Sequence, residues 1–187
     1  MELEKTEIPD VILFKPKIFH DERGYFYESY NQNIFSSFGF NLRFVQDNHS
    51  CSKKGVLRGL HYQLHQPQGK LVRVVRGEIF DVAVDLRHNS VTFCKWIGRT
   101  LSYENKNILW IPAGFAHGFV VLSEWAEVLY KTTDYYAPSF QRTLRWDDPT
   151  IGIQWPITEI PHLSNGDKQG MLLSEAELYS KEIVPFK

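Results

Sequence analysis

Residues 55–63 have the sequence Gly-Val-Leu-Arg-Gly-Leu-His-Tyr-Gln, a strand-like run that carries a guanidinium, Arg58, and an imidazole, His61. Side chains alternate along a strand, so residues three positions apart would point to opposite faces of a sheet. Gly59 lies between them, and a glycine inside a strand often marks a bulge that re-aims a side chain. The run predicts either an edge strand with a solvated Arg58 and a core His61, or a bulged strand that brings both residues to one site.

Short apolar or alternating runs continue on both sides of this stretch and predict further strands. These runs are residues 11–14, 24–30, 44–48, 70–75, 78–86, 93–101, 108–111, 118–122 and 126–133. We expect about nine to eleven short strands in all, at the roughly 8–12-residue spacing typical of sandwiches and barrels. A double-sheet jelly-roll barrel holds that number without long exposed edges, so the predicted fold class is all-β.

The connections between these runs carry turn and helix signals. The charged residues 20–23 separate the first two runs, which predicts a hairpin between them, and Arg76-Gly77 predicts a turn. Residues 31–38 predict one short helix, with Asn31 or Asn33 as its cap and Gly39 as its end.

The pattern loosens after Pro138. The proline-rich remainder predicts an ordered wrap over the barrel, and residues 174–178 predict a short capped terminal helix. The sequence contains no internal repeat and no linker, so residues 1–187 are expected to form a single domain.

The composition excludes several classes of partner. The 187 residues include 22 acidic and 21 basic side chains, which leaves no strong field for nucleic acid or a membrane surface. No apolar run approaches the length of a membrane span, so we expect a soluble, cytoplasmic protein. Cys51 and Cys94 lie in separate runs without metal-ligand spacing, and both are expected to be buried thiols.

Three sets of side chains could carry chemistry if the strands roll together. Candidates for an anionic ligand are Arg23, Arg58, Lys70, Arg73 and Arg76. Candidates for proton transfer are His61, His65, His117, Tyr130 and Asp167, since an Asp from the wrap could orient a histidine base. Phe19, Phe26, Tyr135 and Tyr136 could stack on a flat ring, although core packing is the commoner use of each.

The histidines could hold a metal ion instead of transferring protons. Residues 112–119 are similar to the second histidine motif of metal-binding cupins. His61 and His65 lie four positions apart, however, which on a strand separates two imidazoles by about 13 Å. We therefore predict no metal, and the absence of a Gly-rich dinucleotide fingerprint predicts no nicotinamide cofactor.

Eight blocks together resemble one family, the dTDP-4-dehydrorhamnose 3,5-epimerases, which are cofactor-free sugar-nucleotide epimerases with a cupin jelly roll. The blocks are residues 21–26, 45–48, 55–63, 67–73, 77–87, 112–119, 130–136 and 146–149. They stand in family order and spacing over nearly the whole chain. The resemblance implies an isomerase that acts on a dTDP-linked 4-keto-6-deoxy sugar, and a homodimer in which N-terminal residues reach the neighbouring site.

The resemblance also implies roles for individual residues. His61 would be the base that removes protons next to the 4-keto group, Asp167 its orienting partner, Tyr130 the acid on the opposite face and Lys70 the cation at the enolate oxygen. The implied substrate-binding residues are Arg23, Phe26, Glu28, Gln46, Asn48, Arg58, His117, Tyr136 and Gln141, with Tyr136 stacking on thymine. A base and an acid on opposite faces of a sugar ring are what inversion requires.

The chain departs from the family pattern at two places. Gly166 stands where relatives usually have a lysine before the Asp, and Gln141 stands where they often have a glutamate. The predicted reaction is epimerisation at both C3 and C5. The alternatives are a relative that inverts only one of these carbons, or acts on another nucleotide sugar, and a cupin that binds a sugar nucleotide without catalysis.

Overall fold

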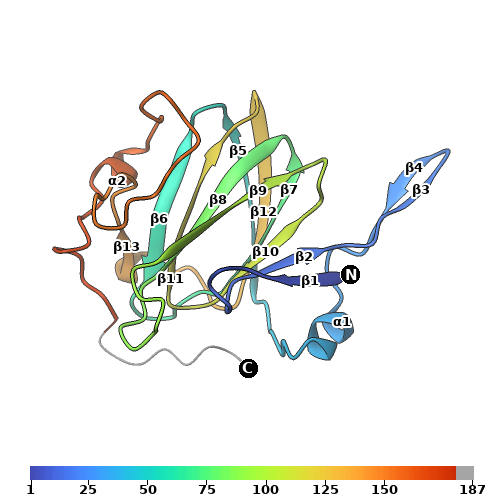
Figure 1. Ribbon diagram of the computed structural model, residues 1–187, viewed down its shortest axis with the longest axis horizontal. Helices are drawn as coiled ribbons and strands as arrows, with labels where there is room; N and C mark the ends of the chain where they lie inside the picture. The colour runs from blue at the N-terminus through green and yellow to red at the C-terminus, as the bar shows by residue number, and fades with distance from the viewer. Residues whose placement is uncertain (180–187) are drawn as a thin grey trace.

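In a computed structural model of the chain, which describes residues 1–179, two antiparallel β-sheets face each other across an apolar core (Figure 1). The six-stranded sheet contains, in spatial order, β1 (Glu2–Lys5), β2 (Ile12–Lys15), β10 (Ile108–Ile111), β7 (Lys70–Arg76), β12 (Trp125–Thr132) and β5 (Gln46–Lys53). The five-stranded sheet contains β13 (Gln141–Thr143), β6 (Leu57–Gln63), β11 (Phe115–Val121), β8 (Glu78–Asp85) and β9 (Trp96–Ser102). This is the predicted double-sheet jelly roll, as two separate sheets and not one closed barrel in residues 1–179.

The core between the sheets follows from the alternation of side chains along each strand. Val72 and Val74 of β7 and Val128 of β12 point inward from one sheet, and Ile79 and Ala83 of β8 point inward from the other. Burial of these aliphatic side chains holds the two sheets together. Polar side chains on the same inward faces, toward one end of the core, form the site described below.

Each sheet is also covered on its outer face. Helix α1 (Gln32–Ser37) places Phe35 on the six-stranded sheet, where it packs against Phe14 and Trp110. The Asn31 side chain caps this helix by accepting the backbone N–H of Asn33, as predicted. The outer face of the five-stranded sheet is covered by the chain after residue 143, which we call the wrap and which includes the short helix α2 (Asn165–Lys168). Functional residues can therefore come from either sheet or from these coverings.

Several sequence-based expectations are wrong in detail. Residues 11–14 do not form a hairpin with 24–30, because β2 pairs with β1 and β10, while β3 (Phe19–Asp21) pairs with β4 (Gly24–Phe26). The structure has thirteen strands in the described residues, more than expected, because β1, β3 and β13 have only three or four mostly polar residues each and fall outside the predicted runs. Residues 174–178 are not helical, since a turn covers 173–175 and no regular element follows it up to residue 179. The second helix is α2, which has no apolar periodicity to reveal it.

The two cysteines differ from the prediction of buried thiols. Cys51 is exposed, because it occupies an outward-facing position on the edge strand β5. Cys94 is half-buried in the turn before β9. None of the helices in the described part of the chain has the length and hydropathy needed to cross a membrane.

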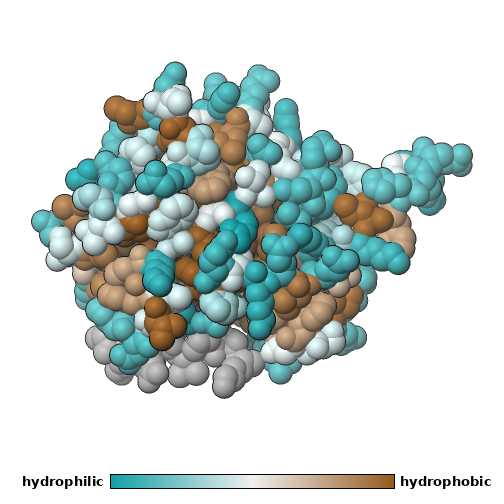
Figure 2. All heavy atoms as spheres, in the orientation of Figure 1, coloured by the Kyte–Doolittle hydropathy of each residue, from teal (hydrophilic) through white to brown (hydrophobic). Residues whose placement is uncertain are grey.

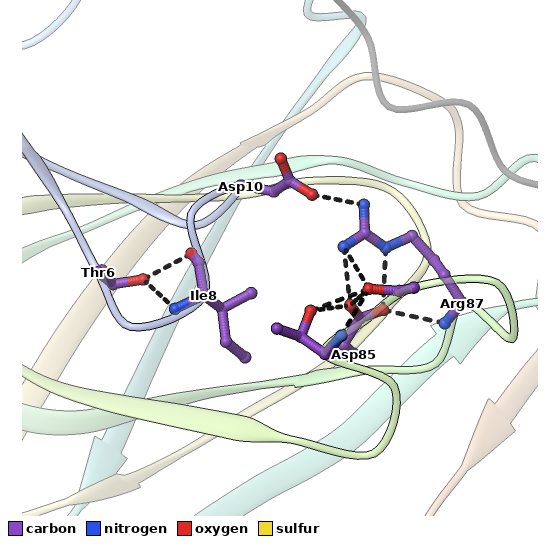
Figure 3. A network of polar contacts seen from close by, with 7 residues as sticks. Thr6, Ile8, Asp10, Asp85 and Arg87 are labelled. Atoms are coloured by element: carbon purple, nitrogen blue, oxygen red, sulfur yellow. Dashed lines mark hydrogen bonds and ion pairs between the residues drawn. The ribbon is translucent and has the colours of Figure 1, made fainter.

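A buried charged network fixes the N-terminal turn to the end of β8 (Figure 3). The Arg87 guanidinium donates to both carboxylate oxygens of Asp85, at 2.9 and 2.7 Å, and to Asp10 Oδ2 at 2.8 Å. The hydroxyls of Ser90 and Thr92 also donate to Asp85 Oδ2. All of these groups are paired with one another, so we interpret the network as structural.

Candidate active site

A bulge in β6 brings Arg58 and His61 to the same face of the sheet. His61 lies opposite His117 on β11, but Arg58 lies opposite Phe119, so the register shifts between them. Gly59, at φ +117°, makes this possible, because a Cβ there would lie 2.6 Å from the Cα of Gly118. The bulged-strand interpretation of residues 55–63 is therefore confirmed.

The inward direction of both side chains follows from their neighbours. Leu60 and Tyr62, on either side of His61, pack outward under the wrap, which leaves His61 on the inner face. The Arg58 guanidinium crosses to the other sheet, where its Nε and Nη2 donate to the Ser52 hydroxyl of β5 at 3.0 and 2.9 Å.

His61 is paired with a carboxylate from the wrap. Its Nε2–H donates to Asp167 Oδ1 at 2.5 Å, and the Asp167 side chain is only 5% exposed. Burial alone would raise the pKa of Asp167, but hydrogen bonds from His61, the Ser164 hydroxyl and the Gly59 backbone hold it below its ordinary value. Asp167 is thus an anion that orients the imidazole and leaves Nδ1 as its free nitrogen.

Lys70 supplies a buried cation close to this pair. It begins β7 on the same inner face as Val72, and its Nζ donates to the backbone carbonyl of His61 at 3.4 Å. Burial lowers the pKa of Lys70 to about 8, although the nearby carboxylate of Asp81 favours its charged form. The ammonium is therefore largely retained at neutral pH in a poorly hydrated position.

His117 and Asp81 form a second buried pair beside Lys70. His117 Nε2 lies 2.7 Å from Asp81 Oδ1, on neighbouring strands of the five-stranded sheet. Burial lowers the pKa of His117 despite the attraction of Asp81, so this imidazole is neutral at neutral pH. Asp81 Oδ2 is buried and has no hydrogen-bond partner among residues 1–179.

Sequence reasoning missed Asp81, Ser52 and Ser164. Asp81 had a usable signal. It lies at every second position with Ile79 and Ala83, so all three share the inner face of β8, where a carboxylate without a partner would cost free energy. Ser52 and Ser164 had no such signal, since their partners are distant or depend on the path of the wrap.

Tyr130 faces the same space from the opposite sheet. It lies on β12 on the inner side with Val128, against the inter-sheet core. Burial and the neighbouring Tyr136 raise the pKa of the Tyr130 phenol, while Arg58 opposes this, and the net shift is upward. The phenol is therefore protonated at neutral pH and available as a donor.

Polar residues of β5 lie next to Tyr130, and Tyr136 and Gln141 lie on two later segments. Asn48 lies directly opposite Tyr130, and the Gln46 amide donates to Asn48 Oδ1 at 2.9 Å. Gln46 also accepts the backbone N–H of Tyr136, whose ring is 54% exposed at the rim. Gln141 of β13 lies opposite Gln63 on β6, one strand from His61.

The structure does not bring Arg23, Phe26 and Glu28 to this site. Arg23 is at the turn of the β3–β4 hairpin, which projects away from the two sheets (Figure 1) and has a hydrophilic end (Figure 2). Phe26, near the other end of β4, is 67% exposed. Glu28 follows the hairpin and accepts a hydrogen bond from Asn31 near α1. These three residues are presented outward.

The other candidates lie outside the inner space. Arg73 points to the outer face of the six-stranded sheet, near Tyr27, and Arg76 pairs with Glu127. His65 is exposed against Phe140, and Phe19 and Tyr135 are also exposed. In residues 1–179, no three His, Cys, Asp or Glu side chains come close enough together to hold a metal ion.

The inner space thus combines three groups with distinct protonation behaviour. The five-stranded sheet presents the His61 imidazole, which is hydrogen-bonded to the Asp167 anion. The six-stranded sheet presents the protonated phenol of Tyr130 on β12 and the buried ammonium of Lys70 on β7. Such an arrangement suits removal of a proton from carbon next to a carbonyl, because the cation can stabilise the developing oxyanion.

Comparison with known proteins gives one consistent family. The family model described as dTDP-4-dehydrorhamnose 3,5-epimerase matches residues 5–175. A dTDP-4-dehydrorhamnose 3,5-epimerase of Pseudomonas aeruginosa is 58% identical over 180 residues, which cover 96% of this chain and 99% of the relative.

Two solved structures extend the comparison. A dTDP-6-deoxy-D-glucose-3,5-epimerase of Legionella pneumophila in complex with dTDP-4-keto-L-rhamnose has a TM-score of 0.94 and 48% identity, over 97% of this chain and 99% of that one. A 3'-monoepimerase of Streptomyces bikiniensis in complex with dTDP-quinovose has a TM-score of 0.85 and 31% identity, over 91% and 87% of the two chains.

Proposed function

The chain belongs to the dTDP-4-dehydrorhamnose 3,5-epimerase family, and from this we propose that it inverts C3 and C5 of a dTDP-linked 4-keto-6-deoxyhexose. The observation that carries the proposal is the His61–Asp167 pair on one side of the inner space and Tyr130 on the other. The same chemistry explains why both carbons can react, since each is adjacent to the 4-keto group. The substrate bears a charged diphosphate that crosses no bilayer unaided, so a cytoplasmic location is part of the proposal.

His61 removes the proton in this mechanism. Its Nε2–H is held by Asp167, so Nδ1 takes the proton from C3 or C5 as the C–H bond breaks and its electron pair moves toward the carbonyl oxygen. The imidazolium that forms is stabilised by the Asp167 anion. An enolate at the 4-keto oxygen is the other product of this step.

Lys70 stabilises that enolate, and Tyr130 completes the inversion. A fixed ammonium in a dry site needs little reorganisation as the oxygen becomes negative. The Tyr130 phenol then donates a proton to the opposite face of the carbon. The resulting phenolate takes up a proton from solvent, and the His61 imidazolium releases one to solvent, which resets both groups. Retention would result if His61 returned the proton, so two groups on two sides are required.

The surrounding polar groups bind the nucleotide and sugar. Arg58, which donates to the Ser52 hydroxyl, is suited to bind a phosphate oxygen. Its guanidinium has further N–H groups that do not contact this hydroxyl. We assign sugar and diphosphate contacts to His117, Gln46, Asn48 and Gln141, and the exposed ring of Tyr136 to stacking on thymine.

Reaction in heavy water tests this function. Purified protein incubated with dTDP-4-keto-6-deoxyglucose is expected to give a product with deuterium at both C3 and C5, measured by NMR and mass spectrometry. Deuterium at one carbon, with inversion there only, would favour a monoepimerase. If folded protein binds the nucleotide sugar and exchanges neither proton, the protein is a binder without catalysis and the proposal fails.

We further propose a homodimer in which the β3–β4 hairpin serves the neighbouring site. Its support is the outward projection of Arg23 and Phe26, which leaves two implied binding residues away from the His61 of their own chain. A hairpin that carries binding residues outward is suited to exchange between two copies.

Mixing two inactive variants tests the exchange. Arg23→Ala and His61→Ala chains, coexpressed and purified as a mixture, are expected to recover up to about one quarter of the parent activity, because half of the pairs are mixed and each has one intact site. If each hairpin serves its own chain, no mixed pair contains an intact site. Recovery no greater than the sum of the separate variants would therefore contradict the exchange.

A further inference from the structure

Ser164 contacts Asp167 in two ways, just before α2 begins. Its hydroxyl donates to Asp167 Oδ2 at 2.8 Å, and its Oγ accepts the backbone N–H of Asp167 at 3.1 Å. The other carboxylate oxygen, Oδ1, accepts from His61. Each oxygen of this buried carboxylate therefore has a defined hydrogen-bond donor. The two donors together restrict rotation of the carboxylate about its Cβ–Cγ bond.

The backbone of the segment that carries Asp167 is anchored at its two ends. Before it, His162 bridges to Val56, and after it, Met171 bridges to Leu144, both through backbone hydrogen bonds. Gly170 lies so close to β13 that an added Cβ would approach the Leu144 carbonyl carbon to 2.9 Å. These anchors position the backbone of residues 163–170, but neither contacts the carboxylate.

Helix α2 cannot hold the carboxylate by itself. It has only four residues, too few for a helix to be stable without tertiary support. Gly166, the neighbour of Asp167, adds backbone freedom where a side chain would fit without a clash. The Ser164 hydroxyl is therefore the side-chain restraint that this segment itself provides on the direction of the anion, beside the bonds from His61 and the Gly59 backbone of β6.

We propose that Ser164 is a positioning residue for the His61 base, a role that rests on the function proposed above. Its hydroxyl holds Asp167 so that Oδ1 faces His61 Nε2 and keeps the imidazole in the tautomer with a free Nδ1. An O–H donor to a carboxylate is among the stronger hydrogen bonds in proteins, and it also favours the ionised form. Without it, Oδ2 loses its side-chain donor, and the bonds from His61 and the Gly59 backbone hold the carboxylate in a less defined orientation.

If Ser164 served only to cap α2, its replacement by glycine should leave turnover unchanged. Ser164 is the N-cap of α2, and glycine is also a favourable N-cap residue, so Ser164→Gly should cost the helix little stability. Threonine keeps both the cap and the hydroxyl donor. Glycine and threonine thus separate capping of the helix from donation to the carboxylate.

The experiment compares Ser164→Thr, Ser164→Gly and Ser164→Ala with the parent, and uses Asn165→Ala as a control on the same turn. Turnover is measured by deuterium uptake into dTDP-4-keto-6-deoxyglucose, and the imidazole N–H of His61 is followed by NMR at low field. We expect the Gly and Ala variants to lose about tenfold in kcat with KM unchanged, while Thr and Asn165→Ala stay within about twofold. The low-field N–H signal should weaken in step with kcat.

The experiment distinguishes failure of the proposed function from failure of the role proposed for Ser164. If the parent itself takes up no deuterium, the proposed function is wrong, and the NMR signal then reports on positioning alone. If the parent is active but Ser164→Gly retains parental kcat and an unchanged His61 N–H signal, Ser164 only caps α2 and the inference is overturned. A Thr variant as impaired as Gly would also contradict it, provided that both melt within a few degrees of the parent.

Discussion

Replacing His61 by alanine is expected to lower kcat by at least about 10²-fold with the fold intact, the lower range for loss of one general base. The physical reason is that no other described group on its side of the inner space is free to accept the proton. His117 is engaged with Asp81 and is buried, and Lys70 is protonated at neutral pH. Binding of the nucleotide should change little, because the proposed mechanism assigns the imidazole to the reacting carbon and not to the diphosphate.

The measurement is deuterium exchange at C3 and C5 together with steady-state turnover. His65→Ala is the matched control, since His65 is exposed against Phe140 and lies on the same segment. Asp167→Asn should cause a loss of similar order, because an amide can turn its NH₂ toward Nε2 and favour the wrong tautomer. A loss below about threefold for His61→Ala would remove this residue from the mechanism.

Lys70→Met is expected to lower kcat and, at the same time, to raise the free energy of unfolding. Loss of the ammonium should cost on the order of 3 kcal/mol of transition-state stabilisation, seen as a fall of about 10²-fold in kcat. A defect confined to KM would instead assign Lys70 to the phosphates.

The gain in stability follows from the burial of Lys70. Burial lowers the pKa of Lys70 from its ordinary 10.5 to about 8, so below pH 8 the folded protein bears the cost of a desolvated charge. That cost is on the order of 3 kcal/mol and disappears as pH rises from about 8 to 10.5, where the unfolded chain also loses the proton. Methionine has a similar shape and no charge, so the variant should be more stable at pH 7 by up to that amount.

Urea unfolding at pH 7 and at pH 10 measures this difference. We expect the gap in unfolding free energy between Lys70→Met and the parent to be larger at pH 7 and to narrow at pH 10. Lys95→Met is a suitable control, because Lys95 is exposed and its replacement should have little effect at either pH. Equal gaps at both pH values would mean that packing, and not the charge of Lys70, sets the stability.

The sequence predicts the parts of this molecule that depend on local pattern. Alternation identified the strands around Phe80, Val82 and Val84, and Gly59 marked the bulge that turns Arg58 and His61 inward. Asn31 and Gly39 marked the ends of α1 correctly. These signals lie within a few residues of the feature they determine.

The remaining features depend on contacts between distant segments. Asp167 was assigned through a family resemblance, because a loop sequence does not reveal that it meets His61 106 positions away. The pairing of Arg58 with Ser52 requires knowledge of which strands face each other across the core. The prediction of a helix at residues 174–178 is wrong, and α2 escapes prediction because three polar residues and a glycine after a serine cap have no periodic apolar face.

The wrap has a consequence for how this protein loses activity on heating. Asp167 belongs neither to a sheet nor to the inter-sheet core, and its segment is attached at two single bridges and by packing against the outside of one sheet. Subglobal opening of this segment can therefore detach the anion while the far-ultraviolet circular dichroism of the sheets persists. Amide hydrogens of residues 163–170 should exchange faster than those of β6, and the temperature of inactivation should fall below the calorimetric midpoint.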